Sequence, residues 1–248
     1  SSVVLIPSYL AAIQNYRPEQ TGAPLLWLAI PQLLAGALAV YLLGRVDARL
    51  ILAAGFALVA VACLMDAQIT TLWSGNSFYM SQLILAIGEG LAFNGMVGSI
   101  VLDLLNSGGM ENASAVLSFG GFFQTVRLFG GELGASFVQF FLHSRQVFHY
   151  DHLASGLANG SPAVLARMHL LTAGMRVKSE AANIAAGRAA GLFVGSVRQQ
   201  AFTLAIMDSF TLIACAATAC LFLVLGLHSL KVGFKQIIAA SAQKKAAS

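Results

Sequence analysis

The chain has 248 residues, of which 58% are hydrophobic and only 10% are charged, and its mean hydropathy is +0.78. Soluble domains carry about 25% charged residues, so this composition excludes an ordinary soluble domain and favours a protein that has the lipid bilayer as its solvent. The formal net charge of +4 comes from cations dispersed along the chain without a basic face, which argues against a nucleic-acid-binding protein. No phosphate-binding loop and no nucleophile–base arrangement stands out, so we expect neither an enzyme nor a cofactor.

Six apolar runs predict an all-α membrane bundle of six transmembrane helices. The first run is too short to cross a bilayer as written, and we expect it to be a truncated helix of a longer protein. The other five are near or above the roughly 20 residues that a spanning helix needs. The expected segments are, in chain order, 1–13, 23–43, 50–69, 78–105, 113–142 and 202–228.

The connections between these runs predict a topology. One short connection carries Arg45, Asp47 and Arg49, and residues 229–248 form a tail with four lysines. Short loops and tails that are rich in Lys and Arg stay on the cytoplasmic side. We therefore expect both on that side, with five helices in residues 1–142 and the last helix in residues 202–228. Residues 143–201 would then form a long extracytoplasmic loop, either mobile or with amphipathic helices on the membrane surface.

An arginine in the middle of the fifth run is the strongest functional candidate. A charge at that depth costs at least about 2.5–3.5 kcal/mol, so Arg127 should face protein or water. Gly131 and Gly134 share its helix face, and with Gly130 they would let a partner helix approach closely while Arg127 reaches a carboxylate or a carbonyl. Polar Gln124 lies one turn before it. We expect Arg127 to gate or couple transport; the alternative is a buried hydrogen-bonding strut.

Two glutamates lie at similar depth in the fourth and fifth runs. A carboxyl group in a low-dielectric cavity can bind and release protons near neutral pH. Glu89 is the stronger candidate because glycines flank it and Asn94 is near, whereas Glu132 lies about 140° round the helix from Arg127 and should not pair with it. The alternative for both is a carboxyl satisfied by another helix. Asp66 lies near a predicted helix end, where capping or snorkelling would explain it, so we expect it to matter less than Glu89 for protons.

Histidines and one further acid remain. His143, His149 and His152 follow the fifth run, and the spacing of the last two is one that can ligate a metal on a helix. No cysteine or dense acidic cluster accompanies them, so we expect no metal site. Asp208 lies about two turns into the last run, and we expect it to have a structural or loop-docking role.

Several local patterns recur in a fixed order along the chain. They are Leu5-Ile6-Pro7-Ser8-Tyr9-Leu10, Asn15-Tyr16 with Gly22, Pro31, Gly44-Arg45-Val46-Asp47-Ala48-Arg49 with Gly55, Arg127-Leu128-Phe129-Gly130-Gly131-Glu132-Leu133-Gly134, and Gln200-Ala201 with Asp208 and Phe210. In its order and spacing, this series resembles the C-terminal half of the fourteen-span drug:proton antiporters of the major facilitator superfamily. The resemblance covers essentially the whole chain.

The resemblance implies one half of a major facilitator fold, with the substrate site at the midplane between two halves. It implies a protein of the bacterial inner membrane that exports drug-like or amphipathic compounds in exchange for protons. Its implied partners are the missing N-terminal half and a periplasmic adaptor protein, and a lone half would be inactive because it cannot enclose the pathway. The resemblance also implies that Arg45, Asp47 and Arg49 form a cytoplasmic gate latch; the alternative is a solvated loop that sets topology.

The chain departs from the family pattern in its fourth and fifth runs. Glycine stands where a proline is expected after the glycine-rich stretch 88–95, Glu89 is unusual there, and Glu132 replaces a small residue. These differences leave the substrate open. Two other functions also remain: a facilitator-superfamily carrier of another solute, such as a sugar acid or siderophore, and a non-transporting six-span scaffold or adaptor subunit.

Overall fold

The computed structural model describes residues 2–106, 113–158, 166, 169–174 and 182–226, and within these ranges all regular structure is helical. The all-α architecture predicted from the sequence is therefore confirmed. The basic tail predicted at residues 229–248 lies outside the described residues. The elements, in chain order, are α1 (Ser2–Gln14), η1 (Pro18–Thr21), α2 (Gly22–Leu43), α3 (Ala48–Asp66), η2 (Gly75–Phe78), α4 (Tyr79–Asn106), α5 (Ala113–Ala158) and α7 (Ala182–Gly226).

Four helical segments among the described residues are long and apolar enough to cross a membrane, where the sequence predicted six. They are Pro18–Leu43, Ala48–Asp66, Gly75–Val101 and Gly187–Gly226. The apolar part of α1, Val4–Gln14, is too short, and α5 has the length but not the apolarity. Glycines, Gln124, Arg127 and Glu132 lower the hydropathy of α5. The chain is thus a helical integral membrane protein with four helices of membrane-spanning composition.

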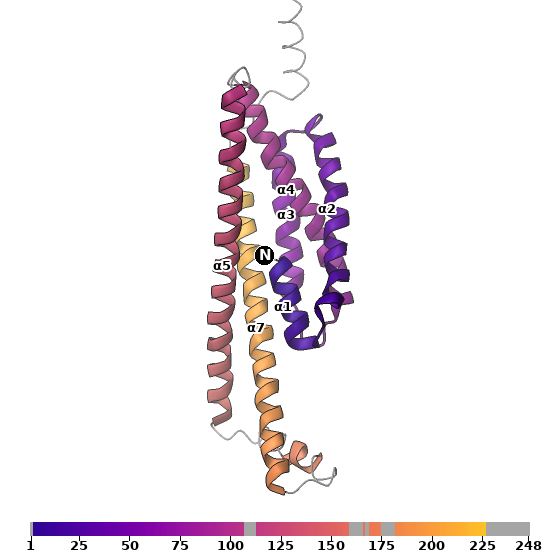
Figure 1. The fold of residues 1–248 in the computed structure, drawn as a ribbon, viewed down its shortest axis with the longest axis vertical. Coiled ribbons are helices and arrows are strands. Elements are labelled where there is room, and N and C mark those ends of the chain that lie inside the picture. The colour runs from indigo at the N-terminus through magenta and orange to yellow at the C-terminus, as the bar shows by residue number, and fades with distance from the viewer. Residues whose placement is uncertain (1, 107–112, 159–165, 167–168, 175–181, 227–248) are drawn as a thin grey trace, which may run out of the picture.

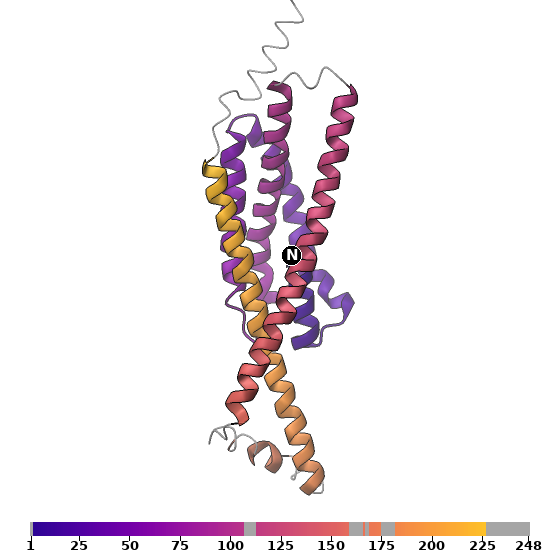
Figure 2. The same ribbon diagram turned by 90° about the vertical axis from the view of Figure 1, so that its left-hand side faces the viewer.

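The helices pack in a continuous series from α2 to α5. Helix α4 packs against both α2 and α3, α3 packs against α7, and α7 packs against α5. Figure 1 shows the short α1 beside α7, with the long pair α5 and α7 along one side of the bundle. The same two helices extend past α1–α4 at one end, and the turned view in Figure 2 shows them crossing each other.

Glycines bring α3 and α4 into backbone contact. A Cβ atom added at Gly55 would lie 2.7 Å from the Cα of Ala92, and one added at Gly88 would lie 2.9 Å from the nitrogen of Val59. Gly88, Ala92 and Gly95 are four and three residues apart, so they form one face of α4. Small residues on such a face allow two membrane helices to pack at van der Waals distance. This contact, the α3–α4 seam, fixes the part of α4 between Gly88 and Gly95.

A hydrophobic core lies where α1, α3, α4 and α7 meet. Tyr9, Phe78 and Phe210 are fully buried there. The Tyr9 hydroxyl donates to the carbonyl oxygens of Thr70 at 2.5 Å and Trp73 at 3.2 Å, so α1 is tied to the loop that follows α3. A buried tyrosine needs such a partner for its hydroxyl, and its ring also packs edge-on against Phe78 with centroids 5.7 Å apart.

The structure differs from the loop expected at residues 143–201. Helix α5 continues without a break to Ala158, and α7 already begins at Ala182. Neither extension contains a proline, so nothing in the backbone stops the helix where the sequence becomes polar. At 1.5 Å per residue, the 46 residues of α5 span about 69 Å, more than twice the roughly 30 Å of a hydrocarbon core. The polar residues after position 142 therefore do not mark the end of the helix.

Candidate functional site

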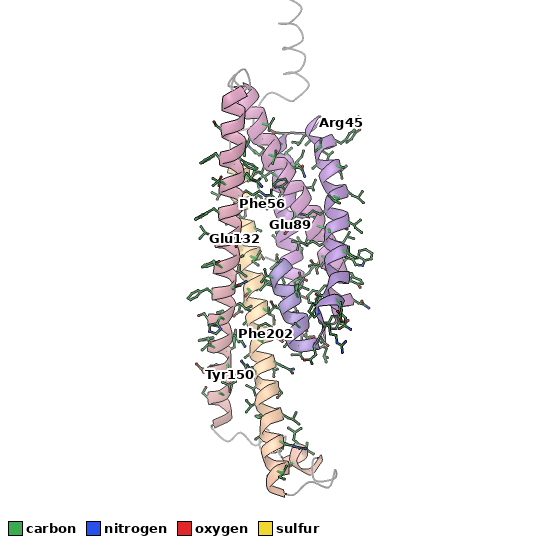
Figure 3. The ribbon with its side chains drawn as sticks, in the orientation of Figure 1. Arg45, Phe56, Glu89, Glu132, Tyr150 and Phe202 are labelled. Carbon is green, nitrogen blue, oxygen red and sulfur yellow. The ribbon has the colours of Figure 1, made fainter. Side chains whose placement is uncertain are left out.

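A cavity of about 730 Å³ lies between α2, α3, α4 and α5. Its volume falls within the roughly 300–1,000 Å³ that is typical of small-molecule sites. Most of its wall is apolar, with aromatic rings from two helices. Its polar and charged lining residues are Gln32, Glu89, Asn94 and Arg127, and its larger apolar ones include Phe56 and Phe93. Figure 3 labels Glu89 and Phe56 on α4 and α3.

Close packing of α2 on α4 positions the acid of this cavity. A Cβ atom added at Gly90 would lie 2.8 Å from the Cβ of Ala35, so the two helices meet directly beside Glu89. This approach lets Gln32 on α2 donate its amide to a Glu89 carboxyl oxygen at 3.4 Å. The side-chain amide of Asn94 donates a hydrogen bond to the carbonyl oxygen of Gly90, one turn earlier in the same helix, at 2.8 Å. Glu89 and Asn94 thus both line the cavity, and each is held by a contact to α2 or to its own helix.

Arg127 enters the cavity from α5, across from the α4 residues. Its guanidinium carbon lies 4.7 Å from the centre of the Phe93 ring, which is a cation–π distance. One guanidinium nitrogen also donates to Gln124, one turn earlier, at 3.5 Å. The sequence predicts a carboxylate or a carbonyl as the partner of Arg127. Within the described residues Arg127 forms no ion pair with a carboxylate, and it contacts an aromatic ring and a neighbouring side-chain amide instead. Its side chain is exposed in this chain.

Three of the predicted pathway residues, Glu89, Asn94 and Arg127, thus line one cavity, and Gln124 contacts the arginine. Glu132 does not join them, because it lies on α5 with an exposed side chain and outside the cavity lining. The α5 helix turns it away from Arg127, as the spacing of five residues requires.

The glycines of α5 were expected to admit a partner helix, and the described part of the chain contains none at that face. A Cβ atom added at Gly130, Gly131 or Gly134 would meet nothing within 4 Å. Close packing of a partner helix at these glycines therefore stays a prediction, since the described residues supply no such helix. Phe137, seven residues after Gly130 and so on the same face, has an exposed side chain.

The charged turn before α3 has a clear local role. Asp47 has an extended backbone conformation and caps α3, because its carboxylate accepts from the backbone N–H of Arg49 at 3.2 Å. The Arg45 guanidinium lies 4.7 Å above the ring of Tyr41 at the end of α2. These contacts explain the turn as a helix boundary, and the gate latch stays a prediction.

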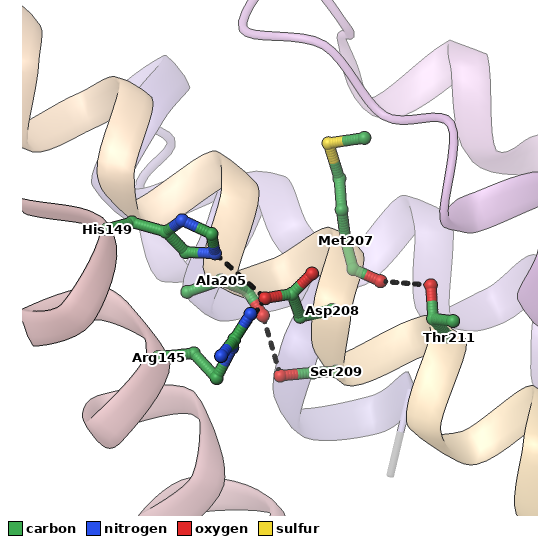
Figure 4. A network of polar contacts seen from close by, with 7 residues as sticks. All are labelled: Arg145, His149, Ala205, Met207, Asp208, Ser209 and Thr211. Atoms are coloured by element: carbon green, nitrogen blue, oxygen red, sulfur yellow. Dashed lines mark hydrogen bonds and ion pairs between the residues drawn. The ribbon is translucent and has the colours of Figure 1, made fainter. Parts of the chain in front are cut away.

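An ion cluster that the sequence analysis did not foresee joins α5 to α7 (Figure 4). Asp208 accepts from Arg145 at 2.6 Å and lies 2.8 Å from the ring nitrogen of His149, both at the same carboxyl oxygen. The sequence predicts a structural or loop-docking role for Asp208 but not its partners, and for His149 it offers only a spacing that suits a metal ligand. Arg145 and His149 are four residues apart, so they share one helix face. That spacing was readable in the sequence, but it has meaning only on a helix, and this stretch was expected to be a loop.

The position of Asp66 near a helix end predicts a place at the membrane interface, but the structure does not put it there. Its side chain is fully buried, and one carboxyl oxygen has no hydrogen-bond partner among the described residues. Gln82 approaches the other oxygen at 3.4 Å. The prediction that Asp66 reaches the membrane interface by snorkelling is therefore wrong. Its place near a helix end was the reason to expect less proton binding at Asp66 than at Glu89, and that reason no longer holds.

Comparisons of the chain with protein-family models, with curated proteins and with solved structures find no match. Function is therefore argued from the motifs of the sequence and from the geometry of the cavity.

Proposed function

We propose that this chain is the C-terminal half of a secondary transporter of the major facilitator superfamily, which exports drug-like or amphipathic compounds in exchange for protons. The observation that carries the proposal is the cavity of about 730 Å³ in which Glu89 and Arg127 lie among aromatic and aliphatic walls. An apolar pocket with a few convergent polar groups is the usual form of a small-molecule site.

The chemistry of the lining fits amphipathic compounds. Phe56, Phe93 and Met96 offer apolar and aromatic contact area, while Gln32 and Asn94 supply neutral hydrogen-bonding groups. Glu89 is the acid through which proton binding and substrate binding can compete. When its carboxylate takes a proton, the charge that holds a basic substrate group is removed, and the substrate is released. When the proton leaves, the carboxylate is available again.

The open side of the cavity fits a second half of the transporter. Large apolar side chains are exposed on two of the helices that border the cavity, among them Leu33 and Leu34 on α2 and Phe122 and Phe129 on α5. In such transporters the site lies at the midplane between two related halves, and rocking of one half against the other alternates access. In this proposal α1 and α5 complete six spans, and the second half shields Arg127 from lipid.

The same proposal includes the cellular setting. The protein resides in the bacterial inner membrane with its C-terminus in the cytoplasm, and a periplasmic adaptor protein takes the exported compound onward. The exposed end of the α5–α7 pair then lies on the periplasmic side.

Transport by the intact protein in proteoliposomes tests this function. We expect an imposed pH gradient to drive uptake of a fluorescent amphipathic dye, and a protonophore to abolish it. Glu89→Gln should lose the response to the pH gradient, because the amide cannot take up and release the proton. Glu19→Gln, an exposed carboxyl in the connection before α2, is the matched control and should transport as wild type does. Dye transport by Glu89→Gln with an unchanged pH profile would remove Glu89 from the proton path, and no gradient-driven transport of any amphipathic dye would reject the exporter.

A further inference from the structure

The buried carboxyl group of Asp66 lies at the end of α3, in the core formed with α1, α4 and α7. It is 0% exposed, and this burial is due to protein side chains and not to lipid. Its polar neighbours on α4 are Ser81 and Gln82, each only 2% exposed. The site is therefore a small cluster of buried polar side chains in an otherwise apolar core, separate from the cavity of Glu89.

The hydrogen bonds at this carboxyl are too few for an ionised group. A carboxylate offers about four acceptor positions. Gln82 supplies one long contact to Oδ2 at 3.4 Å, and Oδ1 has no partner among the described residues. The Ser81 hydroxyl lies within reach of the carboxyl, but it donates its one proton to the carbonyl oxygen of Phe78 at 3.0 Å. An ionised carboxylate buried without compensation is so unfavourable that such a group neutralises instead. Asp66 in this arrangement fits the neutral acid.

The charged and titratable groups around Asp66 do not offer a counter-ion. The nearest are the Cys63 thiol one turn earlier on α3 and the Tyr9 hydroxyl from α1, and Glu89 lies further along α4. On α7 the charged group is Asp208, whose carboxylate pairs with cations of α5. Residues 67–78 carry no charge at all. A proton is thus the positive charge that can neutralise Asp66 in the described part of the chain.

We propose that Asp66 is a proton-binding site. A proton from water on the side of the 67–74 loop converts the carboxylate to the neutral acid, and its return to water restores the carboxylate. On Oδ2 this proton can be donated to the side-chain oxygen of Gln82 once the amide is turned, since the two ends of an amide are assigned from the hydrogen-bond network. Tyr9 covers the approach through its bonds to the carbonyl oxygens of Thr70 and Trp73, so exchange with water requires this contact to open.

Only the use of this proton rests on the proposed function. In a proton-driven exporter, Asp66 is a second proton site, and it is nearer to the loop end of the bundle than Glu89. The binding of a proton at Asp66 holds for any function of the chain, because it follows from burial and missing partners.

Infrared difference spectroscopy of the purified intact protein in lipid tests the proposal. Between neutral and strongly alkaline pH, we expect the wild type to lose a C=O stretching band of a protonated carboxylic acid. Asp66→Asn should lack this band, and Asp151→Asn, an exposed acid on α5, should keep it. Asp66→Glu should show the band at a shifted position, which keeps the test decisive if the Asn variant does not fold. Thermal unfolding of each variant establishes that it is folded.

Three results would overturn the proposal. The first is a folded Asp66→Asn protein with an unchanged band, and the second is an Asp66→Glu protein with no shift. The third is a spectral change that follows the sodium concentration at fixed pH, because the site would then bind a metal cation. A band assigned to Asp66 in a protein that no pH gradient drives would reject the exporter and leave the proton site standing. Gradient-driven transport without this band would do the reverse.

Discussion

Two regions of this molecule are rich in glycine, and they differ in what faces the glycines. Between α3 and α4, Gly55 and Gly88 lie against the backbone of the opposite helix, with no room for a methyl group. On α5, Gly130, Gly131 and Gly134 face open space. The first region is a finished helix–helix contact that holds the bundle together. The second is a glycine-rich surface with no partner in the described chain, and it lies on α5, the helix that carries Arg127 into the cavity.

This contrast separates stability from function in the molecule. Substitutions in the α3–α4 seam should act on folding, because two backbones must move apart. Substitutions along α5 should act on transport, because the described part of the chain packs nothing against that face.

Gly55→Leu should have the largest effect. The new side chain would collide with the backbone of Ala92, which cannot move aside as a side-chain tip can. Overpacking of a core typically costs about 1–3 kcal/mol, and collision with backbone places this change at about 3 kcal/mol or more. We expect little or no folded protein, measured by size-exclusion chromatography and thermal unfolding. The control is Gly187→Leu, at an exposed position with nothing within 4 Å, and it should unfold as wild type does. Equal stability of the two variants would contradict the tight seam.

The difference between these regions shows what the sequence could predict. The α-helical membrane fold followed from apolar runs, and the cavity group Glu89 followed from its depth and its glycine neighbours. Which glycines are packed did not follow, because a glycine has the same letter whether its face is covered or open. The Arg145–Asp208 contact was missed for another reason. The polar residues after position 142 favour a loop in the sequence, but the structure continues α5 through them. Arg145 and His149 share a face only on a helix, so their common contact with Asp208 could not be predicted from a loop. Asp66 was misjudged because distance from a helix end says nothing about what other helices cover it.

Arg127→Ala should have the second-largest effect. The variant loses the positive charge of the cavity and its contact with Phe93, so transport should fall at least about tenfold, or about 1.4 kcal/mol in activation free energy. Arg127→Lys should restore transport only in part, since an ammonium lacks the planar guanidinium. Arg17→Ala, at an exposed position before α2, is the control and should transport normally. Dye export and the amount of folded protein are measured in the same cells. Normal export by Arg127→Ala would make the charge dispensable, and loss of folded protein would make Arg127 a structural strut.

Asp208→Asn should weaken the α5–α7 contact without abolishing folding. Both partners of the Arg145–Asp208 pair are about one-third exposed, at 35% and 32%, so solvent screens the pair. We therefore expect a loss of about 1 kcal/mol in the free energy of unfolding, near the upper end for exposed ion pairs. Asp151→Asn, an exposed acid two residues after His149 on α5, should change stability by less than about 0.5 kcal/mol. Identical unfolding curves for the two variants would show that the ion cluster does not hold α5 to α7.

The smallest effect on the protein is expected from single cysteines that report topology. In a background without Cys63, Cys215 and Cys220, a cysteine at Asp151 directly follows Tyr150, which Figure 3 labels on the part of α5 that extends past the bundle. A cysteine at Val46 lies in the turn before α3. The positive-inside rule predicts that the arginines of that turn lie in the cytoplasm, and the Asp151 position must then lie outside if α5 crosses the membrane. A membrane-impermeant maleimide added to intact cells should therefore label the Asp151 cysteine, and it should label the Val46 cysteine only after the membrane is opened. Labelling of both from outside would place the two ends of α5 and the turn on one side. The open glycine face of α5 would then lie along the membrane surface, and it could not line a path between two halves of a transporter.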